Sequence, residues 1–250
     1  MKRIFFIKFI FLLINLYGQK NIEERISFPH ISASYMVQFP GADMKKNFGI
    51  NSNIGCSFSW KFKNNIMLEL NPNFIFGNKL KGEAAHIFDS IKTSNGTIIN
   101  MHGEYAKVRT FERGYFIGIK LGYIYNFTRP NPNSGILFSL GSGILQHKIR
   151  IENDGNNAPQ IINEYKYGYD KMRYGFCLSQ FIGYIYFSKS QILNFYSGFE
   201  IYEAWTRSGR SWDFNLMKKD TNKYFDILYS IKFGWIIPIY SKPPQEYYYY

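Results

Sequence analysis

Charged residues of both signs interrupt stretches that otherwise alternate between large apolar side chains and small or polar ones. Six of them fall on the small or polar parity of their stretch: Lys61, Lys63, Glu69, Lys120, Glu200 and Lys232. Successive side chains of a strand point to opposite faces, so these residues share one face if the stretches are strands. We predict an ion-pair network of Glu69, Lys120, Glu200, Lys232 and Lys61 on that face. Within it, Glu200 and Lys232 lie at similar heights on the last two stretches, and we expect them to pair.

The histidines are the other candidates for chemistry, and there are four of them: His30, His86, His102 and His147. His86 and His102 lie in a long loop and could approach each other, because the stretch IFDSIKTSNGTIINMHG has the pattern of a hairpin turning at Asn95–Gly96. A metal site needs a third ligand and closer pairing, so we expect no metal and no other cofactor. His147 shares a face with the distant Ser139, without a nucleophile, base and orienting group at a suitable spacing. The sequence therefore predicts that the protein is not an enzyme.

The elements that must position these residues are eight stretches with a period of two. In residues 115–127, YFIGIKLGYIYNF, the odd positions carry only large apolar or aromatic residues. We expect strands at 31–39, 49–63, 66–77, 115–127, 135–150, 174–187, 192–205 and 225–240. The connections after the second, fourth and sixth strands are short. Those after the third, fifth and seventh span about 78–113, 151–173 and 206–224.

The length and composition of these strands indicate which face is the interior. A soluble exported barrel or sandwich also alternates, but its strands usually span about five or six residues. Thirteen residues rise about 43 Å, enough to cross an apolar band of about 25 Å at a tilt. The small face is rich in Gly, Ser and Asn, as the narrow interior of an eight-stranded barrel requires. We predict an all-β fold: an eight-stranded antiparallel transmembrane up-and-down β-barrel with short periplasmic turns and long extracellular loops.

In such a barrel the charged network faces the lumen. It is then either a gate or polar path, or a plug of paired charges. The narrow interior favours the plug, because side chains alone fill it.

Two features do not fit a regular strand pattern. Pro72 and Pro238 remove ladder hydrogen bonds, so we expect bulges or earlier strand ends there. The alternation also places Gln180 on the lipid face unless a bulge shifts it.

The N-terminal sequence MKRIFFIKFIFLLINLYGQ has a basic start, an apolar run and a small residue, Gly18, at its end. We expect a signal peptide over 1–18; a retained membrane anchor is the alternative. Without a cysteine at the cleavage point, a lipoprotein is not expected. The predicted organisation continues with a periplasmic N-terminal segment (19–28), the outer-membrane barrel (29–241) and a periplasmic C-terminal tail (242–250).

The C-terminal tail follows a strand that ends in an aromatic residue. Pro243–Pro244 cannot donate ladder hydrogen bonds and should end that strand. We predict a docking or assembly-recognition segment formed by Tyr240, Tyr247, Tyr248, Tyr249 and Tyr250.

The chain is basic, with a formal charge of +12 over 250 residues, and 20% of its residues are aromatic. An exported protein does not meet nucleic acid, so we expect no nucleic-acid partner. Two loop stretches interleave basic and aromatic residues, YKYGYDKMRYG (165–175) and AWTRSGRSWDF (204–214). Above an outer leaflet these stretches suit an anionic glycolipid headgroup or another protein, or they form an ordinary solvated rim. Cys56 and Cys177 are too few and too far apart for a disulfide framework.

With eight strands assigned, the chain resembles the small outer-membrane barrels of Gram-negative bacteria of the OmpX, OmpW and OmpA-barrel type. More narrowly, it resembles outer-membrane proteins of Bacteroidota. The segments that carry this resemblance are FPGADMKKNFGINSNIG (39–55), NFIFGNK (73–79), ERGYFIGIKLG (112–122), PNPNSGILFSLGSGILQHKIRIEND (130–154), SQFIGYIY (179–186), NFYSGFE (194–200) and GWIIPIY (234–240).

The resemblance implies a non-enzymatic barrel that accompanies machinery for barrel assembly or type IX secretion. We therefore expect a structural or accessory subunit of an envelope complex in the cell outer membrane. The alternative is a stand-alone narrow channel or a loop-displayed binding protein. The expected partners are outer-membrane lipid, other subunits of such a complex and the barrel-assembly machinery.

Overall fold

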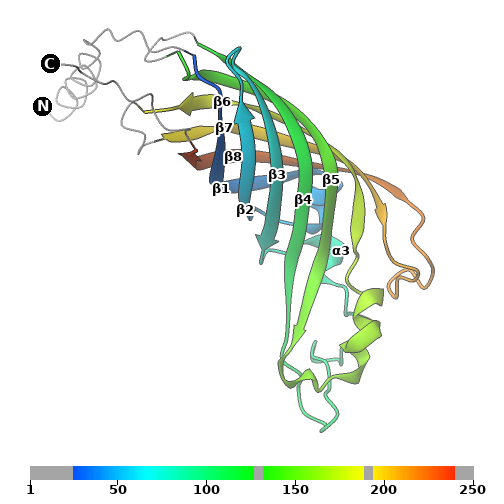
Figure 1. Cartoon of the computed structure of the whole chain (residues 1–250). Coiled ribbons are helices and arrows are strands. Elements are labelled where there is room, and N and C mark those ends of the chain that lie inside the picture. Colours follow the sequence, from blue (N-terminus) through cyan, green and yellow to red (C-terminus); the bar gives the residue numbers. More distant parts are fainter. Residues whose placement is uncertain (1–24, 127–131, 189–193, 240–250) are drawn as a thin grey trace, which may run out of the picture.

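The computed structural model describes residues 25–126, 132–188 and 194–239. Eight antiparallel strands, each paired with its neighbours in sequence, close into a barrel through pairing of β1 with β8. The strands are β1 (Phe28–Ala42), β2 (Asn51–Lys61), β3 (Ile66–Gly77), β4 (Val108–Tyr125), β5 (Gly135–Asn153), β6 (Arg173–Tyr186), β7 (Asn194–Ser208) and β8 (Lys223–Pro238). This confirms the predicted all-β, eight-stranded up-and-down barrel (Figure 1).

The connections differ in length at the two ends of the barrel. The links β2–β3, β4–β5 and β6–β7 lie at one end, the short-turn end, which also holds the start of β1 and the end of β8. In the β2–β3 turn, Asn65 has a φ of 64°, a conformation that asparagine tolerates. The opposite, loop end carries short helices: α2 (Met44–Asn47), α3 (Gly82–Ala85), η1 (Asp154–Asn156), η2 (Pro159–Ile161) and η3 (Asn163–Gly168). Among the described residues, no helix has the length and apolar character needed to cross a membrane.

The β4–β5 hairpin is longer than the sequence indicated. Its ladder runs from Val108↔Asn153 to Tyr125↔Ile136, so β4 begins seven residues before the predicted start at 115. The predicted loop 78–113 is correspondingly shorter. The added residues, VRTFERG, carry three charges, which gives this part of the strand the composition of a loop. Figure 1 shows the two strands extending past the rest of the barrel.

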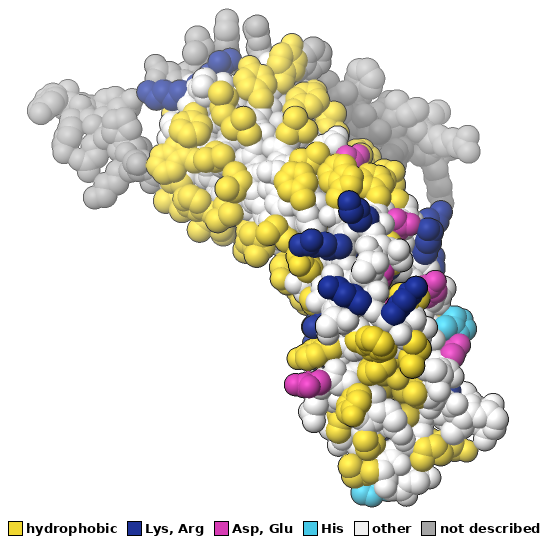
Figure 2. Space-filling model, turned by 90° about the vertical axis from the view of Figure 1, so that its right-hand side faces the viewer, with side chains coloured by type: hydrophobic (Ala, Val, Ile, Leu, Met, Phe, Trp, Pro, Cys, Tyr) yellow, Lys and Arg dark blue, Asp and Glu magenta, His cyan; other side chains and the backbone are white. Residues whose placement is uncertain are grey.

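The two faces of the barrel follow the predicted parity. Small and polar residues, among them Ser57, Asn71 and Ser179, are buried and point inward. Large apolar residues point outward and are between 48% and 68% exposed, as one residue from each of β1 to β8 illustrates: Tyr35, Phe58, Leu70, Ile119, Leu140, Phe176, Phe199 and Phe233. Figure 2 shows this hydrophobic belt, with a band of Lys and Arg side chains between it and the loops.

Glycine permits two strands to approach closely on the inner face. Gly118 of β4 is paired with Gly143 of β5. A Cβ atom on Gly143 would lie 2.2 Å from the carbonyl oxygen of Ile117, closer than any side chain tolerates. The narrow curvature of the barrel at this point therefore depends on the missing side chain.

The two prolines have different outcomes. Pro72 lies inside β3 and is the register partner of Ile117 on β4. On its other side, the β2–β3 ladder is interrupted but resumes in the same register, from Gly55↔Asn73 to Phe58↔Leu70. The expected bulge or strand end at Pro72 is therefore wrong. Pro238 is the last residue of β8, which confirms the expected earlier end of that strand.

Candidate functional site

A cluster of buried charges crosses the lumen near the middle of the barrel. Lys232 Nζ lies 2.9 Å from Glu200 Oε2, and Lys120 Nζ contacts the other carboxylate oxygen of Glu200. All three side chains are at most 2% exposed. Glu200 on β7 therefore links β8 to β4 across the interior of the barrel through two ion pairs.

Glu69 supplies the second negative charge of this lumenal cluster. It is the register partner of Lys120 on the neighbouring strand and is buried. Among the described residues, Glu69 forms no ion pair with either lysine of the cluster. Two lysines and two glutamates give a cluster without net charge, which lowers the cost of burying it.

Lys61 is not part of the cluster, contrary to the predicted network. It is the last residue of β2, at the short-turn end, where its Nζ donates to Asn133 Oδ1 at 2.9 Å and to the carbonyl of Ile26 at 3.2 Å. Parity placed it on the correct face. Parity does not give its height along the barrel: Glu69 is the register partner of Ser59, so Lys61 lies two residues closer to the short-turn end than Glu69 does.

Apolar layers close the lumen above and below the charges. Toward the loop end, Phe116 and Tyr202 pack at 4.9 Å between ring centroids, and both lie within about 6 Å of Lys120 Nζ. Toward the short-turn end, Phe181 and Tyr196 pack at 5.9 Å and flank Lys232 in the same way. Each pair belongs to a larger buried cluster. The charged cluster therefore lies between two buried apolar clusters.

The sequence pattern did not show these apolar layers. The inner parity is dominated by small and polar residues, and the few large apolar ones, such as Phe116 and Ile124, appeared as exceptions to the pattern. Both are fully buried. The available signal was their position: large residues on the small-residue face of a narrow barrel must fill its interior.

Near the loop end, His147 of β5 has a buried partner on the opposite wall of the barrel, Asp226 of β8. Its Nε2 lies 3.0 Å from Asp226 Oδ2, and the Thr206 hydroxyl donates to the same carboxylate oxygen. Ser139 lies eight residues along β5, about 26 Å away. The described chain therefore does not bring Ser139 and His147 together as nucleophile and base, and their geometry gives no support to a hydrolase.

The sequence predicted a hairpin that would bring His86 close to His102, and this hairpin is absent from the described residues. Gly96 does form a turn, with a φ of 76° and a hydrogen bond to Thr93, but turns over 86–91 and an isolated bridge at Ile99 replace the expected strands. His86 instead bonds to Asp89 at 2.9 Å. No group of three possible metal ligands occurs among the residues that the structure describes.

The two basic and aromatic loop stretches meet at the loop end and form an open pocket of about 480 Å³. The Arg210 guanidinium donates to both oxygens of Asp170 and lies 4.2 Å from the centroid of the Tyr167 ring. Hydrogen bonding to Asp170 raises the pKa of Arg210. Tyr165 stacks on Phe214 at 6.4 Å. The loop end is therefore an ordered surface that presents aromatic rings.

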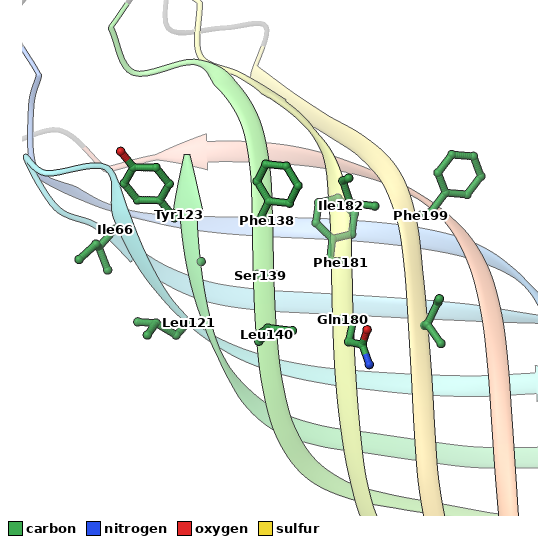
Figure 3. Close-up of a pocket in the computed structure, with 12 residues that line it drawn as sticks. Ile66, Leu121, Tyr123, Phe138, Ser139, Leu140, Gln180, Phe181, Ile182 and Phe199 are labelled. Atoms are coloured by element: carbon green, nitrogen blue, oxygen red, sulfur yellow. The ribbon is translucent and has the colours of Figure 1, made fainter. Parts of the chain in front are cut away.

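A polar pair interrupts the hydrophobic belt on β6 and β7. Gln180 is exposed, as its parity predicted, and no bulge displaces it. Its Nε2 makes a long hydrogen bond of 3.5 Å to Oε2 of the half-buried Glu203. Gln180 also borders an outer groove of about 640 Å³. Figure 3 shows it beside Leu140, with Ile182 and Phe199 on the same side of the wall.

Two sets of predictions fall outside the described residues. The predicted signal peptide, 1–18, lies within residues 1–24, which the structure does not describe. The predicted recognition segment, Tyr240 and Tyr247 to Tyr250, and the whole C-terminal tail, 242–250, also lie outside the described residues.

Comparison with known proteins finds similarity at the level of structure alone. No protein-family model matches the chain, and no curated protein matches it by sequence. Neisserial surface protein A is 10% identical, with 84% of this chain and 96% of that one covered and a TM-score of 0.45. Ail of Yersinia pestis is 9% identical, with coverages of 86% and 99% and a TM-score of 0.44. The outer membrane protein OprG of Pseudomonas aeruginosa is 12% identical, with coverages of 86% and 99% and a TM-score of 0.38. At these scores we draw no functional argument from them.

Proposed function

We propose that the protein is an integral outer-membrane β-barrel that acts as a structural or accessory subunit of an envelope complex, in barrel assembly or protein secretion. The membrane setting follows from the belt on β1 to β8. On soluble monomers, exposed apolar patches rarely exceed a few hundred Å² and occupy one part of the surface. In this barrel, by contrast, exposed apolar residues lie on all eight strands and surround the whole wall. A closed barrel also satisfies every strand hydrogen bond within lipid.

The filled lumen argues against the alternative of a narrow channel. The neutral cluster of Glu69, Lys120, Glu200 and Lys232 lies between two buried apolar clusters, and its side chains, at most 7% exposed, fill the middle of the lumen. Function therefore resides on the outer face and in the loops.

The observation that carries the accessory role is the pair Gln180–Glu203. A carboxylate that faces hydrocarbon is costly, and a partner that donates a hydrogen bond would remove that cost. The groove beside Gln180 is apolar apart from that side chain and Ser139. We infer a lateral contact with a membrane-embedded protein that inserts an apolar ridge into the groove and a donor opposite Glu203.

Purification in mild detergent tests this role. We expect the wild-type barrel to co-purify in a large assembly, and the double variant Gln180→Leu, Glu203→Leu to leave it. The matched control is Ser197→Leu, an exposed outward residue of β7 away from the groove. A wild-type barrel that purifies alone and conducts ions across planar bilayers would contradict the proposal.

Loop-displayed binding is a second candidate, favoured by the aromatic pocket at the loop end. Tyr165, Tyr167 and Trp212 line it and are 46% to 60% exposed, while Glu164 and Arg210 supply polar groups. Flat rings beside hydrogen-bonding groups suit a sugar ring. We expect a glycan array to show binding by the detergent-solubilised barrel that Trp212→Ala abolishes and Tyr105→Ala, a change to another exposed loop tyrosine, does not.

A further inference from the structure

A second groove on the outer wall combines an apolar floor with a positively charged edge. It has a volume of about 570 Å³ and lies on the outside of β5 to β8, at the loop-end edge of the hydrophobic belt. Phe176 and Trp205 form part of its lining; they stack at 6.2 Å and are 53% and 50% exposed. Its loop-end edge carries Arg207 and Lys223.

The two cations lie next to each other by strand register. Arg207 of β7 is the direct partner of Lys223 of β8, and both side chains are exposed. The Arg207 guanidinium lies 5.6 Å from the centroid of the Tyr174 ring, and this cation–π contact favours a position of the guanidinium over the groove. Two adjacent cations of this kind, one of them a guanidinium fork, match the charge and geometry of a phosphate group.

The described residues offer neither cation a carboxylate partner. Among the described residues, no carboxylate forms an ion pair with Arg207 or Lys223. The acidic residue that faces outward on β7, Glu203, lies four residues away, about 13 Å along the strand, and does not line the groove. By contrast, two other exposed cations near the loop end are paired, Arg109 with Asp154 and Arg150 with Glu152.

We propose that this groove binds a phosphorylated glycolipid of the outer leaflet, with the phosphate on Arg207 and Lys223 and an acyl chain along Phe176 and Trp205. The proposal rests on the proposed outer-membrane location. There the loop-end edge of the belt is the depth at which lipid headgroups meet acyl chains. A free phosphate would use the cations but leave the aromatic floor uncovered, whereas a lipid satisfies both.

The test measures binding of lipid A to the purified, detergent-solubilised full-length barrel by native mass spectrometry. Removing two charges with Arg207→Gln, Lys223→Gln should weaken lipid A binding about 30-fold, since each cation near an anionic lipid surface contributes about a fivefold factor. The matched control, Arg109→Gln, Arg150→Gln, removes two charges that carboxylates already neutralise and should change binding less than about threefold. Dephosphorylated lipid A should bind the wild type as weakly as lipid A binds the double variant.

Three results would overturn the lipid site. They are an equal loss in both double variants, equal binding of dephosphorylated lipid A, and full displacement of lipid A by inorganic phosphate at equal concentration. Heat-modifiable gel migration and outer-membrane fractionation of the same variants separate this proposal from the proposed function. A barrel that folds and fractionates with the outer membrane without preferring lipid A refutes the site alone, while absence from that fraction refutes the location on which it rests.

Discussion

The inner and outer faces of β7 each carry a glutamate, and the two carboxylates have opposite surroundings. Glu200 points into the lumen, is completely buried and contacts Lys120 and Lys232. Three residues later, Glu203 points outward and has one long hydrogen bond, from Gln180. Residues of the same type on one strand thus differ in role because the pleat reverses their environment. The inner carboxylate holds the barrel walls together, and the outer one is available to a partner.

The largest expected effect comes from removing the inner charge. Glu200→Gln leaves two lysines with no paired carboxylate in a closed interior, and breaking a buried pair in this way costs about 3–5 kcal/mol. The matched change on the outer face, Glu203→Gln, should alter stability by less than about 1 kcal/mol. Urea unfolding of both variants in lipid vesicles measures the difference. Equal effects would mean that the lumenal cluster does not support the fold.

An intermediate effect is expected from adding volume to the inner face. Gly143→Ala places a methyl group against the Ile117 carbonyl and should cost about 1–3 kcal/mol, as overpacking does. The neighbouring Ser142 is exposed on the outer face, so Ser142→Val should be tolerated. Midpoints of heat-modifiable gel migration would rank the two variants. A Gly143→Ala barrel as stable as the Ser142→Val barrel would show that the strands have room to separate.

The smallest effect is expected at the loop end, where charges are solvated. Asp43 accepts hydrogen bonds from Lys46 and from the Phe225 amide, and these lower its pKa below the ordinary value of 3.8. A lowered folded-state pKa stabilises the fold above the unfolded pKa, and this contribution is lost as the pH falls through the folded pKa. Asp43→Asn should therefore lower the Tm by about 2–3 °C or less at neutral pH.

The pH dependence of Asp43→Asn gives the control. The difference in Tm between wild type and variant should shrink as the pH falls below 3.8 and vanish once Asp43 is protonated in the folded state. A difference that persists unchanged in acid would mean that the side chain acts through packing and not through its charge.

The sequence predicted the fold well because alternation is a local property. Parity placed Glu200, Lys120 and Lys232 on the inner face and Gln180 on the outer face. It failed where composition hides a strand, as in the charged start of β4 at Val108–Gly114. It also failed at Pro72, since a proline in a long strand can lose ladder bonds on one side without a change of register.

The contacts across the barrel could not be predicted from local sequence patterns. The height of each inward residue depends on the register of every strand pair between it and its neighbour, and register is set by turns and by the closure of β1 on β8. For this reason Lys61 seemed a member of the lumenal cluster and is not, and the contact of Glu200 with Lys120, three strands away around the wall, required the closed barrel.

The sequence by itself determined the number of strands, their direction of burial and the placement of short and long connections, because each follows from side-chain periodicity over a few residues. Tertiary structure alone decided that two apolar clusters flank the lumenal charges, that two loops join in one aromatic pocket, and that Arg207 meets Lys223 above an apolar groove. These features join residues distant in sequence, and only the shear and curvature of the closed sheet fix which of them meet.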